Sequence, residues 1–507
     1  MMFRDDLRTT PPLRRMFLLP ALALAAWTAS TPASGERPNI VLIVADDLNW
    51  NDCGPYGHPS IRTPNLDALA RDGLTFERAY LTTNSCSPSR ASILTGRYPH
   101  QTGAEQLHWP IPAGVPTLAQ VLRDAGYHTA AAGKWHLGDA VRDHFDRIEE
   151  ASTAGFVLPS SKTADAGAMI AADPSGCGDW VRVLADRPRD RPFFAWLASL
   201  DPHREYADGA LTPPHDAAHV IVPPHLPDVP AVRSDMAMYY DEIGRLDTFV
   251  GDVVDELKRQ EILDETLLVF LSDNGRPFPR DKTTLYDGGI RTPLIAHQPG
   301  VISAGRRSMS LVSSVDIAAT CLRAAGVSTD ALGSAGKSFF DVLERPDRTH
   351  RRYAFAEDHW HDYEDHGRAV TDGNFKMIRN DYPDLPNTPP ADAGRSPTWA
   401  AMRSLREAGR LTAPQRSPFR SPRPARELYD LRRDPAESRN VAGDPAYAAV
   451  EQRLASELRS WSERTDDFLP TVRTPDEFDR RTGRPDASVR RRPRASKKAM
   501  FGTIGAY

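Results

Sequence analysis

The sequence predicts an α/β fold with a mainly parallel central sheet flanked by helices, and a smaller C-terminal α+β subdomain. Three apolar runs of strand length, residues 39–45, 193–199 and 267–272, are rich in aliphatic and aromatic residues, as strands buried on both faces are. Segments with helix-start and helix-stop residues lie between these runs, which is typical of an α/β layer fold. At 507 residues, the chain is long enough to bury a large core.

The charge of the chain limits its partners. Its formal net charge of -5 gives no general attraction to nucleic acid or to an anionic membrane. Residues 479–498 form a basic run, but we interpret residues 471–507 as a solvated, poorly ordered tail rather than as a binding surface for an anionic polymer. We therefore expect no nucleic-acid partner.

The N-terminus, residues 1–35, has the pattern of an export signal. Arg14 and Arg15 precede an apolar run, and small residues then offer a cleavage site near Ala33. The run is shorter than the roughly 20 apolar residues that a membrane-spanning helix needs. No cysteine that could carry a lipid precedes Cys53. We therefore expect an exported protein, periplasmic or secreted, without a membrane anchor.

The cysteines are few and widely separated, and none has CxxC spacing: Cys53, Cys86, Cys177 and Cys321. Neither a zinc framework nor a disulfide scaffold is indicated, although one structural pair stays open.

Helix punctuation supports the predicted order of elements. Three helices are each opened by a hydroxyl residue, and glycine ends the first two: residues 64–73 after Thr63, residues 118–126 after Thr117, and a long helix opened by Ser234. A further strand is expected at residues 128–133.

The chain is predicted to divide into a catalytic domain, residues 36–340, and the smaller subdomain, residues 341–470. Short strands in the second part are expected at residues 353–360, 373–380 and 427–435, with a helix near residues 445–464. The Pro- and Arg-rich stretch between them, residues 381–426, is interpreted as a long irregular excursion.

Polar residues follow the predicted strands, at the ends where open α/β sheets bind ligands. They are Asp46 and Asp47, Lys134 and His136, Asp201 and His203, and Asp273 and Asn274. The first and last pairs offer only oxygen atoms, which calcium or magnesium prefers, and calcium tolerates irregular geometry. The alternative is that the acidic residues cap helices in the turns.

Cys86 is placed among small polar residues where a helix is expected to begin. Ser87 is expected to cap this helix, Pro88 suits its first turn and Gly96 ends it. The start of a helix favours an anion, and Arg90 in the same turn is unfavourable unless something negative lies nearby. Two other interpretations stay open, a buried structural thiol and a reactive thiolate.

The extended segment CSPSRASILTGRYPH, residues 86–100, resembles the sulfatase motif C-x-P-S-R with its following TGR, in which the cysteine is oxidised to formylglycine after translation. Other segments resemble that family in the same order: NIVLIVADDL, GKWHLG, DPH, SDNG and KTTLYDGGIRTPLI. The resemblance covers residues 36–465. It implies an alkaline-phosphatase-like α/β fold and a sulfatase that acts on a sulfated carbohydrate.

The resemblance also implies a nucleophile and a metal. Formylglycine made from Cys86 would, as its hydrate, attack sulfur and later expel sulfate. The implied calcium ligands are residue 86 together with Asp46, Asp47, Asp273 and Asn274. An enzyme that generates formylglycine is an implied partner.

Five further residues match family positions that act on the sulfate group. Lys134 and Lys282 would neutralise the sulfate oxygens, and Arg90 would orient the hydrated aldehyde. His203 would protonate the departing substrate atom, and His136 would accept a proton when sulfate is expelled.

Some segments resemble the sulfamidase (N-sulfoglucosamine sulfohydrolase) branch of the family, notably FAWLASLDPHRE and LSDNGRPFPR. Lys282, however, stands where that branch tends to have arginine, and YDGGIRTP is closer to O-sulfatases. The polar segment 357–368, with His359 and His361, is predicted to line the sugar subsite, and a solvated loop is the alternative. The hypothesis is cleavage of N-sulfoglucosamine in heparan-type glycosaminoglycan degradation.

Other functions stay open beside this hypothesis. An O-sulfatase, or a phosphodiester or phosphonate ester hydrolase on the same scaffold, would use the same metal and cations. A non-catalytic alternative is an exported binding protein with unmodified Cys86.

Overall fold

The computed structural model describes residues 37–151, 173–486 and 488–489. Residues from Arg37 onward form one compact unit. The predicted signal peptide lies outside the described residues, as does the predicted tail beyond residue 489. Within the described ranges, no helix is both long and apolar enough to cross a membrane.

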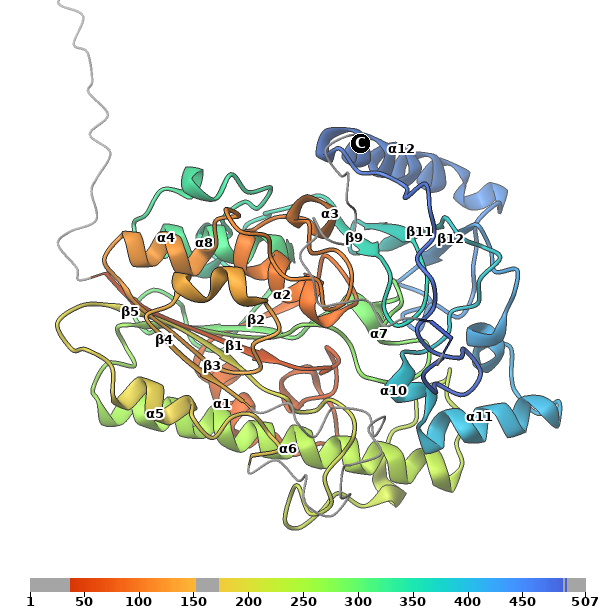
Figure 1. Ribbon diagram of the computed structural model, residues 1–507, viewed down its shortest axis with the longest axis horizontal. Coiled ribbons are helices and arrows are strands. Elements are labelled where there is room, and N and C mark those ends of the chain that lie inside the picture. The colour runs from red at the N-terminus through yellow and green to blue at the C-terminus, as the bar shows by residue number, and fades with distance from the viewer. Residues whose placement is uncertain (1–36, 152–172, 487, 490–507) are drawn as a thin grey trace, which may run out of the picture. The chain divides into compact units, whose positions relative to one another are not determined.

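A large sheet forms the centre of this unit (Figure 1). Over the described residues it has eight strands, in the order β4-β3-β5-β1-β6-β7-β2-β8. β7 runs antiparallel to both β6 and β2, and the other neighbours are parallel. The bounds are β1 Asn39–Ala45, β2 Leu74–Tyr80, β3 His128–Gly133, β4 Arg147–Glu150, β5 Phe193–Ala198, β6 Thr266–Ser272, β7 Leu294–His297 and β8 Arg306–Ser313. The predicted, mainly parallel central sheet is therefore confirmed.

Helices cover both faces of the large sheet because its central strands are apolar on both sides. In β1, Ile40, Leu42 and Val44 belong to one core cluster, and Val41 and Ile43 belong to another. The first cluster includes residues of α2 (Cys86–Thr95), α4 (Leu118–Asp124), α8 (Ile317–Ala324) and α9 (Phe340–Glu344). The second includes residues of α1 (Pro64–Asp72), α5 (Trp180–Ala185) and α6 (Pro230–Arg259). Figure 1 shows α4 and α8 on one side of the strands and α5 and α6 on the other.

The predicted helix starts are right for α1 and α4 and wrong for α6. Thr117 Oγ1 accepts a hydrogen bond from the backbone N–H of Gln120 at the start of α4. α6 begins at Pro230, four residues before Ser234, which lies inside it. Proline suits a first helical position because its fixed φ fits the helix and its missing N–H would have no partner there.

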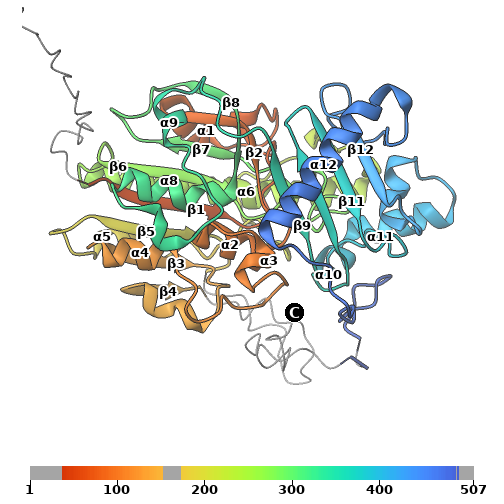
Figure 2. The same ribbon diagram turned by 90° about the horizontal axis from the view of Figure 1, so that it is seen from above.

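A smaller antiparallel sheet follows in sequence, in the order β12-β11-β10-β9 (Figure 2). Its strands are β9 Ala354–Asp358, β10 Gly367–Thr371, β11 Phe375–Asn380 and β12 Arg426–Asp430. α12 (Ala448–Thr465) packs Leu454, Leu458 and Trp461 into a core cluster that includes Phe355 and Val370 of this sheet. This arrangement of strands and helix is the predicted α+β part.

The sequence analysis interpreted residues 381–426 as a long irregular excursion, and this interpretation is wrong in part. They contain α10 (Ala391–Gly394) and α11 (Pro397–Glu407). Ser396 Oγ accepts a hydrogen bond from the backbone N–H of Trp399 at the start of α11, and Trp399 and Met402 are buried in the core under the large sheet. Two other short helices, α3 (Pro99–Thr102) and α7 (Asp287–Ile290), lie near the residues described next.

Candidate active site

The carboxyl ends of β3, β5, β1 and β6 are neighbours at one edge of the large sheet. β1 and β6 pair in parallel up to their last residues, so Asp46 and Asp47 come side by side with Asp273 and Asn274. Lys134 directly follows β3. The parallel topology thus gathers residues that lie far apart in the sequence.

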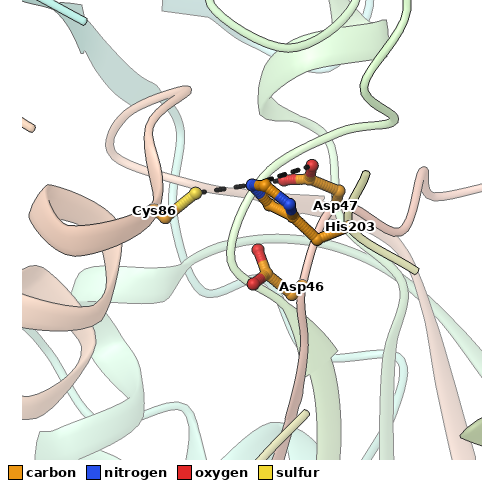
Figure 3. A group of neighbouring side chains, drawn as sticks. All are labelled: Asp46, Asp47, Cys86 and His203. Carbon is orange, nitrogen blue, oxygen red and sulfur yellow. Dashed lines mark hydrogen bonds and ion pairs between the residues drawn. The ribbon is translucent and has the colours of Figure 1, made fainter. Parts of the chain in front are cut away.

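A cluster with the chemistry of a metal site lies at this edge (Figure 3). Asp46, Asp47, Cys86 and His203 each offer a ligand atom, and these atoms lie within 4.8 Å of one another. Asn274 Nδ2 donates to Asp47 Oδ1 at 2.6 Å. Oδ1 of Asp46 and Oδ1 of Asn274 are buried without a hydrogen-bond partner among the described residues. Buried oxygen atoms of this kind fit a hard divalent cation.

Burial sets the direction of the pKa shift for two of these carboxylates but not for the third. It raises the pKa of Asp47 to about 7, although Lys282 opposes the shift, and it raises the pKa of Asp273 to about 6. For Asp46 burial is outweighed by Lys134 and His203, which hold its pKa below the usual range. A bound cation would favour the ionised form of all three side chains.

Cys86 is the first residue of α2, and its Sγ lies 3.9 Å from Asp47 Oδ1. Ser85 stands at the N-cap position, and Ser87 does not cap the helix as predicted, because its hydroxyl accepts a hydrogen bond from the backbone N–H of His108. Burial raises the pKa of the Cys86 thiol well above its usual range. The unmodified side chain would be a neutral thiol, which argues against the reactive-thiolate interpretation.

Three cationic side chains each pair with one of the carboxylates: Arg90 Nε with Asp273 Oδ2 at 2.7 Å, Lys282 Nζ with Asp47 Oδ2 at 2.8 Å, and Lys134 Nζ with Asp46. Asp273 is therefore the negative group that the position of Arg90 required. Burial lowers the pKa of Lys282, but Asp47 and the other acidic groups around it together raise it more, so the ammonium stays charged. The site concentrates positive charge where an anionic substrate group could bind.

His203 lies at the same edge, with Nε2 3.9 Å from Asp47 Oδ2. Its Nδ1 hydrogen-bonds the carbonyl oxygen of Arg204, which can only accept, so Nδ1 carries a proton and Nε2 faces the carboxylates. Burial and the charge of Lys282 lower the pKa of His203 to about 4. The ring is therefore neutral near pH 7 unless an anion binds beside it.

His136 pairs with a second histidine that the sequence analysis did not identify. Its Nε2 lies 2.7 Å from Nδ1 of His108. Its Nδ1 is buried without a hydrogen-bond partner among the described residues. Burial and the proximity of His108 hold the pKa of His136 well below its usual value, so the ring is neutral near pH 7.

The two histidines predicted for the sugar subsite have different surroundings. His361 Nδ1 lies 2.7 Å from the hydroxyl of Ser85, next to Cys86. His359 Nε2 instead hydrogen-bonds Glu357 at 2.7 Å within a buried network.

Asp392 was also missed by the sequence analysis. It lies in α10, inside the stretch interpreted as irregular, with Oδ2 3.6 Å from His203 Nε2. A single aspartate in a Pro- and Arg-rich segment carries no sequence signal for this position, since tertiary packing alone brings it there.

Comparisons with known proteins agree with this geometry. Residues 38–327 match the sulfatase family, and residues 278–385 match the C-terminal region of N-sulphoglucosamine sulphohydrolase. Human N-sulphoglucosamine sulphohydrolase is 32% identical over 478 residues, which cover 87% of this chain and 92% of the relative. An ulvan-active sulfatase of Formosa agariphila is 30% identical over 455 residues, which cover 84% of this chain and 75% of the relative.

A solved structure, of a protein in complex with its substrate D-glucosamine-2-N,6-O-disulfate, has a TM-score of 0.64 and 21% sequence identity. The match covers 86% of this chain and 99% of that chain, so the two share a fold.

Proposed function

The chain belongs to the sulfatase family, and we propose that it removes the N-linked sulfate of glucosamine in a heparan-type saccharide. As a member of this family it is a hydrolase of sulfuric esters or sulfamates. The N-sulfate assignment is supported by the match of residues 278–385 to N-sulphoglucosamine sulphohydrolase and by the human relative of that name.

The observation that carries the sulfatase part of this proposal is the position of Cys86. It starts α2 beside Asp47, at the edge of the sheet where Lys134, Lys282 and Arg90 gather. A helix start and three cations together favour a compact anion such as a sulfate group. An exported binding protein with an unmodified thiol would have no need of the adjoining carboxylate cluster.

The family implies formylglycine at position 86 and a metal ion, and the surrounding residues fit both. Formylglycine supplies a regenerable oxygen nucleophile, and a divalent ion acidifies that oxygen and neutralises sulfate charge. We propose calcium as the ion, with Asp46, Asp47, Asp273 and Asn274 as ligands. All of these side chains offer oxygen, and calcium accepts an irregular ligand set more readily than magnesium does.

The cationic residues have separate roles in the proposed reaction. Lys134 and Lys282 bind the sulfate oxygens and neutralise the charge that develops on them. Arg90 is fixed by Asp273 at 2.7 Å and orients the side chain of residue 86.

Two histidines move protons. His203 donates a proton from Nε2 to the departing nitrogen, and the negative charge of bound sulfate raises its low pKa toward that task. His136 accepts a proton at Nδ1, the nitrogen not used by His108. His359 and His361 remain proposed substrate-binding residues, and the contact of His361 with Ser85 supports its place near the sugar.

We also propose the processing of the chain. Residues 1–35 direct export to the periplasm or out of the cell, and a formylglycine-generating enzyme converts Cys86. The boundary near residue 340 between the catalytic domain and the C-terminal subdomain is likewise a proposal, and it falls between the last strand of the large sheet and the first strand of the small one.

The proposed function is tested by substrate comparison on the mature protein. Defined saccharides with N-, 2-O- or 6-O-sulfated glucosamine are incubated with it, and released sulfate is measured. We expect release from N-sulfated glucosamine. Release from O-sulfated compounds alone would make the enzyme an O-sulfatase, and faster turnover of an aryl phosphate than of the matched aryl sulfate would overturn the sulfatase assignment.

A variant at position 86 provides the control for the nucleophile. Cys86→Ser in a preparation whose wild type is fully converted should lower kcat by about 10³-fold or more, since loss of a nucleophile costs at least this much. Mass analysis of the peptide around residue 86 shows whether the thiol has been replaced by an aldehyde. Full activity of a protein whose residue 86 keeps an intact thiol would contradict the proposal.

A further inference from the structure

Asp392 comes from the C-terminal part of the chain but lies among the proposed catalytic residues. It belongs to α10, between β11 and α11. Its Oδ2 is 3.6 Å from Nε2 of His203 and 3.8 Å from Nζ of Lys282. Only 14% of the side chain is exposed. A carboxylate is thus placed beside the group that we propose protonates the leaving atom.

Hydrogen bonds to the backbone of α10 fix the direction of this carboxylate. The N–H of Ala393 donates to Asp392 Oδ1 at 2.6 Å. The N–H of Ala391 donates to Oδ2 of Asp362 at 2.9 Å, which holds the start of the helix. Oδ2 of Asp392 is therefore the oxygen that faces His203 and Lys282.

Asp392 is negatively charged in a site built for an anion. Burial acts to raise its pKa, but Lys282 and His203 lower it more, so the net pKa lies below the usual range. A fixed negative charge next to bound sulfate is unfavourable unless the substrate places a positive or hydrogen-donating group beside it. The charge therefore points to the chemistry of the leaving group.

The distances allow one substrate atom to contact both His203 and Asp392. A hydrogen-bonded atom lies about 2.8–3.0 Å from its partner. Because His203 Nε2 and Asp392 Oδ2 are 3.6 Å apart, a single atom can lie within this distance of both. That atom is the one that departs from sulfur, since His203 is its proposed proton donor.

Sulfamates and sulfate esters differ at this atom. The bridging nitrogen of a sulfamate still carries a hydrogen, which can be donated to a carboxylate. The bridging oxygen of an ester carries only lone pairs and would be repelled by it. We propose that Asp392 selects sulfamate over sulfate ester by accepting a hydrogen bond from the leaving nitrogen. This proposal rests on the sulfatase function argued above and names the residue that sets its N-sulfate preference.

The proton balance is consistent with this role. The S–N bond would break as sulfur bonds to the oxygen carried at position 86, which reacts in its ionised form and so brings no proton, and the S–N electron pair stays on nitrogen. Nitrogen takes the proton of His203 Nε2 and leaves as a neutral amine. At neutral pH the amine gains a second proton from water, and Asp392 Oδ2 balances the ammonium charge until the product departs.

The test compares two substrates in Asp392→Asn. We expect the ratio of kcat/KM for N-sulfoglucosamine to that for an aryl sulfate ester to fall about 30-fold, the usual effect of losing one hydrogen bond to a charged group. An amide can still fill the space of the carboxylate, but its NH2 group donates to an ester oxygen. An equal fall with both substrates would mean that Asp392 only supports His203 and Lys282, and would overturn the proposal.

Asp384→Asn is the matched control. Asp384 lies in the same segment of the chain but is exposed, and its Oδ2 pairs with Arg473 Nη1 at 2.6 Å. Its substitution should leave the substrate ratio unchanged. Thermal melting of both variants shows whether each is folded, and Asp392→Ser serves as a second variant if the asparagine variant is not.

Binding of the amine product provides a readout that does not need turnover. Calorimetry of the wild type should give about tenfold tighter binding of glucosamine than of N-acetylglucosamine, which carries no positive charge, and Asp392→Asn should remove this difference. Equal binding of both sugars to the wild type would overturn the proposal. If the wild type cleaves esters but no sulfamate, the proposed substrate is wrong. The binding measurement then tests independently whether Asp392 contacts the amine.

Discussion

Lys282 has a buried ammonium whose charge is balanced by Asp47 at 2.8 Å. Asp47 is also a proposed calcium ligand, so the same lysine can compete with the cation for the carboxylate and, once the cation binds, serve the sulfate oxygens. Removal of Lys282 should therefore weaken catalysis without weakening metal binding.

Lys282→Ala should lower kcat/KM for the sulfated substrate by about 10²–10³-fold, because a buried cation that stabilises developing charge is lost. Metal affinity should stay the same or increase, because Asp47 loses a competing partner. Steady-state kinetics and calcium titration of the chelated protein measure the two quantities.

Lys258→Ala is the control for this variant. Lys258 is on α6 with 59% of its side chain exposed, and neither quantity should change. A fall in metal affinity of Lys282→Ala together with activity would mean that the lysine organises the metal site instead of binding sulfate.

At the residue scale, the site residues that directly follow central strands were predictable. Those that reach the site only through tertiary contacts were not. Asp46 and Asp273 follow apolar runs that had to be central strands, and parallel central strands end at one edge. Asp392 and His108 reach the site through tertiary contacts with His203 and His136. No local pattern in the chain encodes such contacts, so these two residues could not be predicted from the sequence.

At the scale of elements, a buried ion pair joins the smaller sheet to the helices next to Cys86. Glu357 is at the end region of β9, and its Oε1 lies 2.7 Å from Nδ1 of His100 in α3. Its Oε2 accepts the backbone N–H of His100 at 3.1 Å. α3 follows α2 in the chain, so this pair helps to hold the cysteine-bearing helix against the smaller sheet.

Glu357→Gln should destabilise the protein by about 3 kcal/mol, because it leaves a buried histidine without its charged partner. Burial acts to raise the pKa of Glu357, but His100 holds it well below its ordinary value of 4.5, so this stability is present above pH 4.5 and is lost as pH falls further. Burial lowers the pKa of His100, but Glu357 raises it above 6.5, so that contribution is full below pH 6.5 and is lost as pH rises through the raised pKa. The difference from wild type should thus be largest between about pH 4.5 and 6.5.

Thermal or denaturant unfolding at pH 5.5 and pH 8.5 checks this prediction. Glu463→Gln, on an exposed position of α12, should change stability little at either pH. A loss of stability that is equal at both pH values would indicate that the pair acts through packing alone.

The elements show where local sequence signals suffice. α11 carries a serine at its N-cap and a proline at its first position, so it was recognisable, but the many Pro and Arg residues around it hid the pattern. β10 was not recognisable, because the polar segment before it resembles a loop and the strand is defined by its pairing with β9 and β11. Strands of a small sheet depend on their neighbours more than central strands of a large one do.

At the scale of the whole molecule, the candidate site combines side chains at the ends of large-sheet strands with side chains from helices, one of which lies between β11 and β12 in the sequence. β1 and β6 provide the carboxylates, α2 provides Cys86, and α10 provides Asp392. β1 and β6 are buried along their whole length. A ligand that joins the ends of these two strands therefore stabilises the centre of the large sheet.

Metal binding should therefore raise the melting temperature of the whole unit. A ligand at a hundredfold excess over its Kd contributes about 2.7 kcal/mol. With an unfolding entropy of roughly 2.1 cal/mol/K per residue, this corresponds to a rise of about 3 °C for a unit of this size. Calorimetric melting after chelation, and again after calcium or magnesium is added, measures the shift. Calcium should give the larger shift because it accepts the irregular set of oxygen ligands. Asp273→Asn should lose the shift, whereas Asp255→Asn, which alters a side chain with 78% exposure on α6, should keep it. If Asp273→Asn kept the full shift, the metal would bind elsewhere, and the ligand set proposed from β1 and β6 would be wrong.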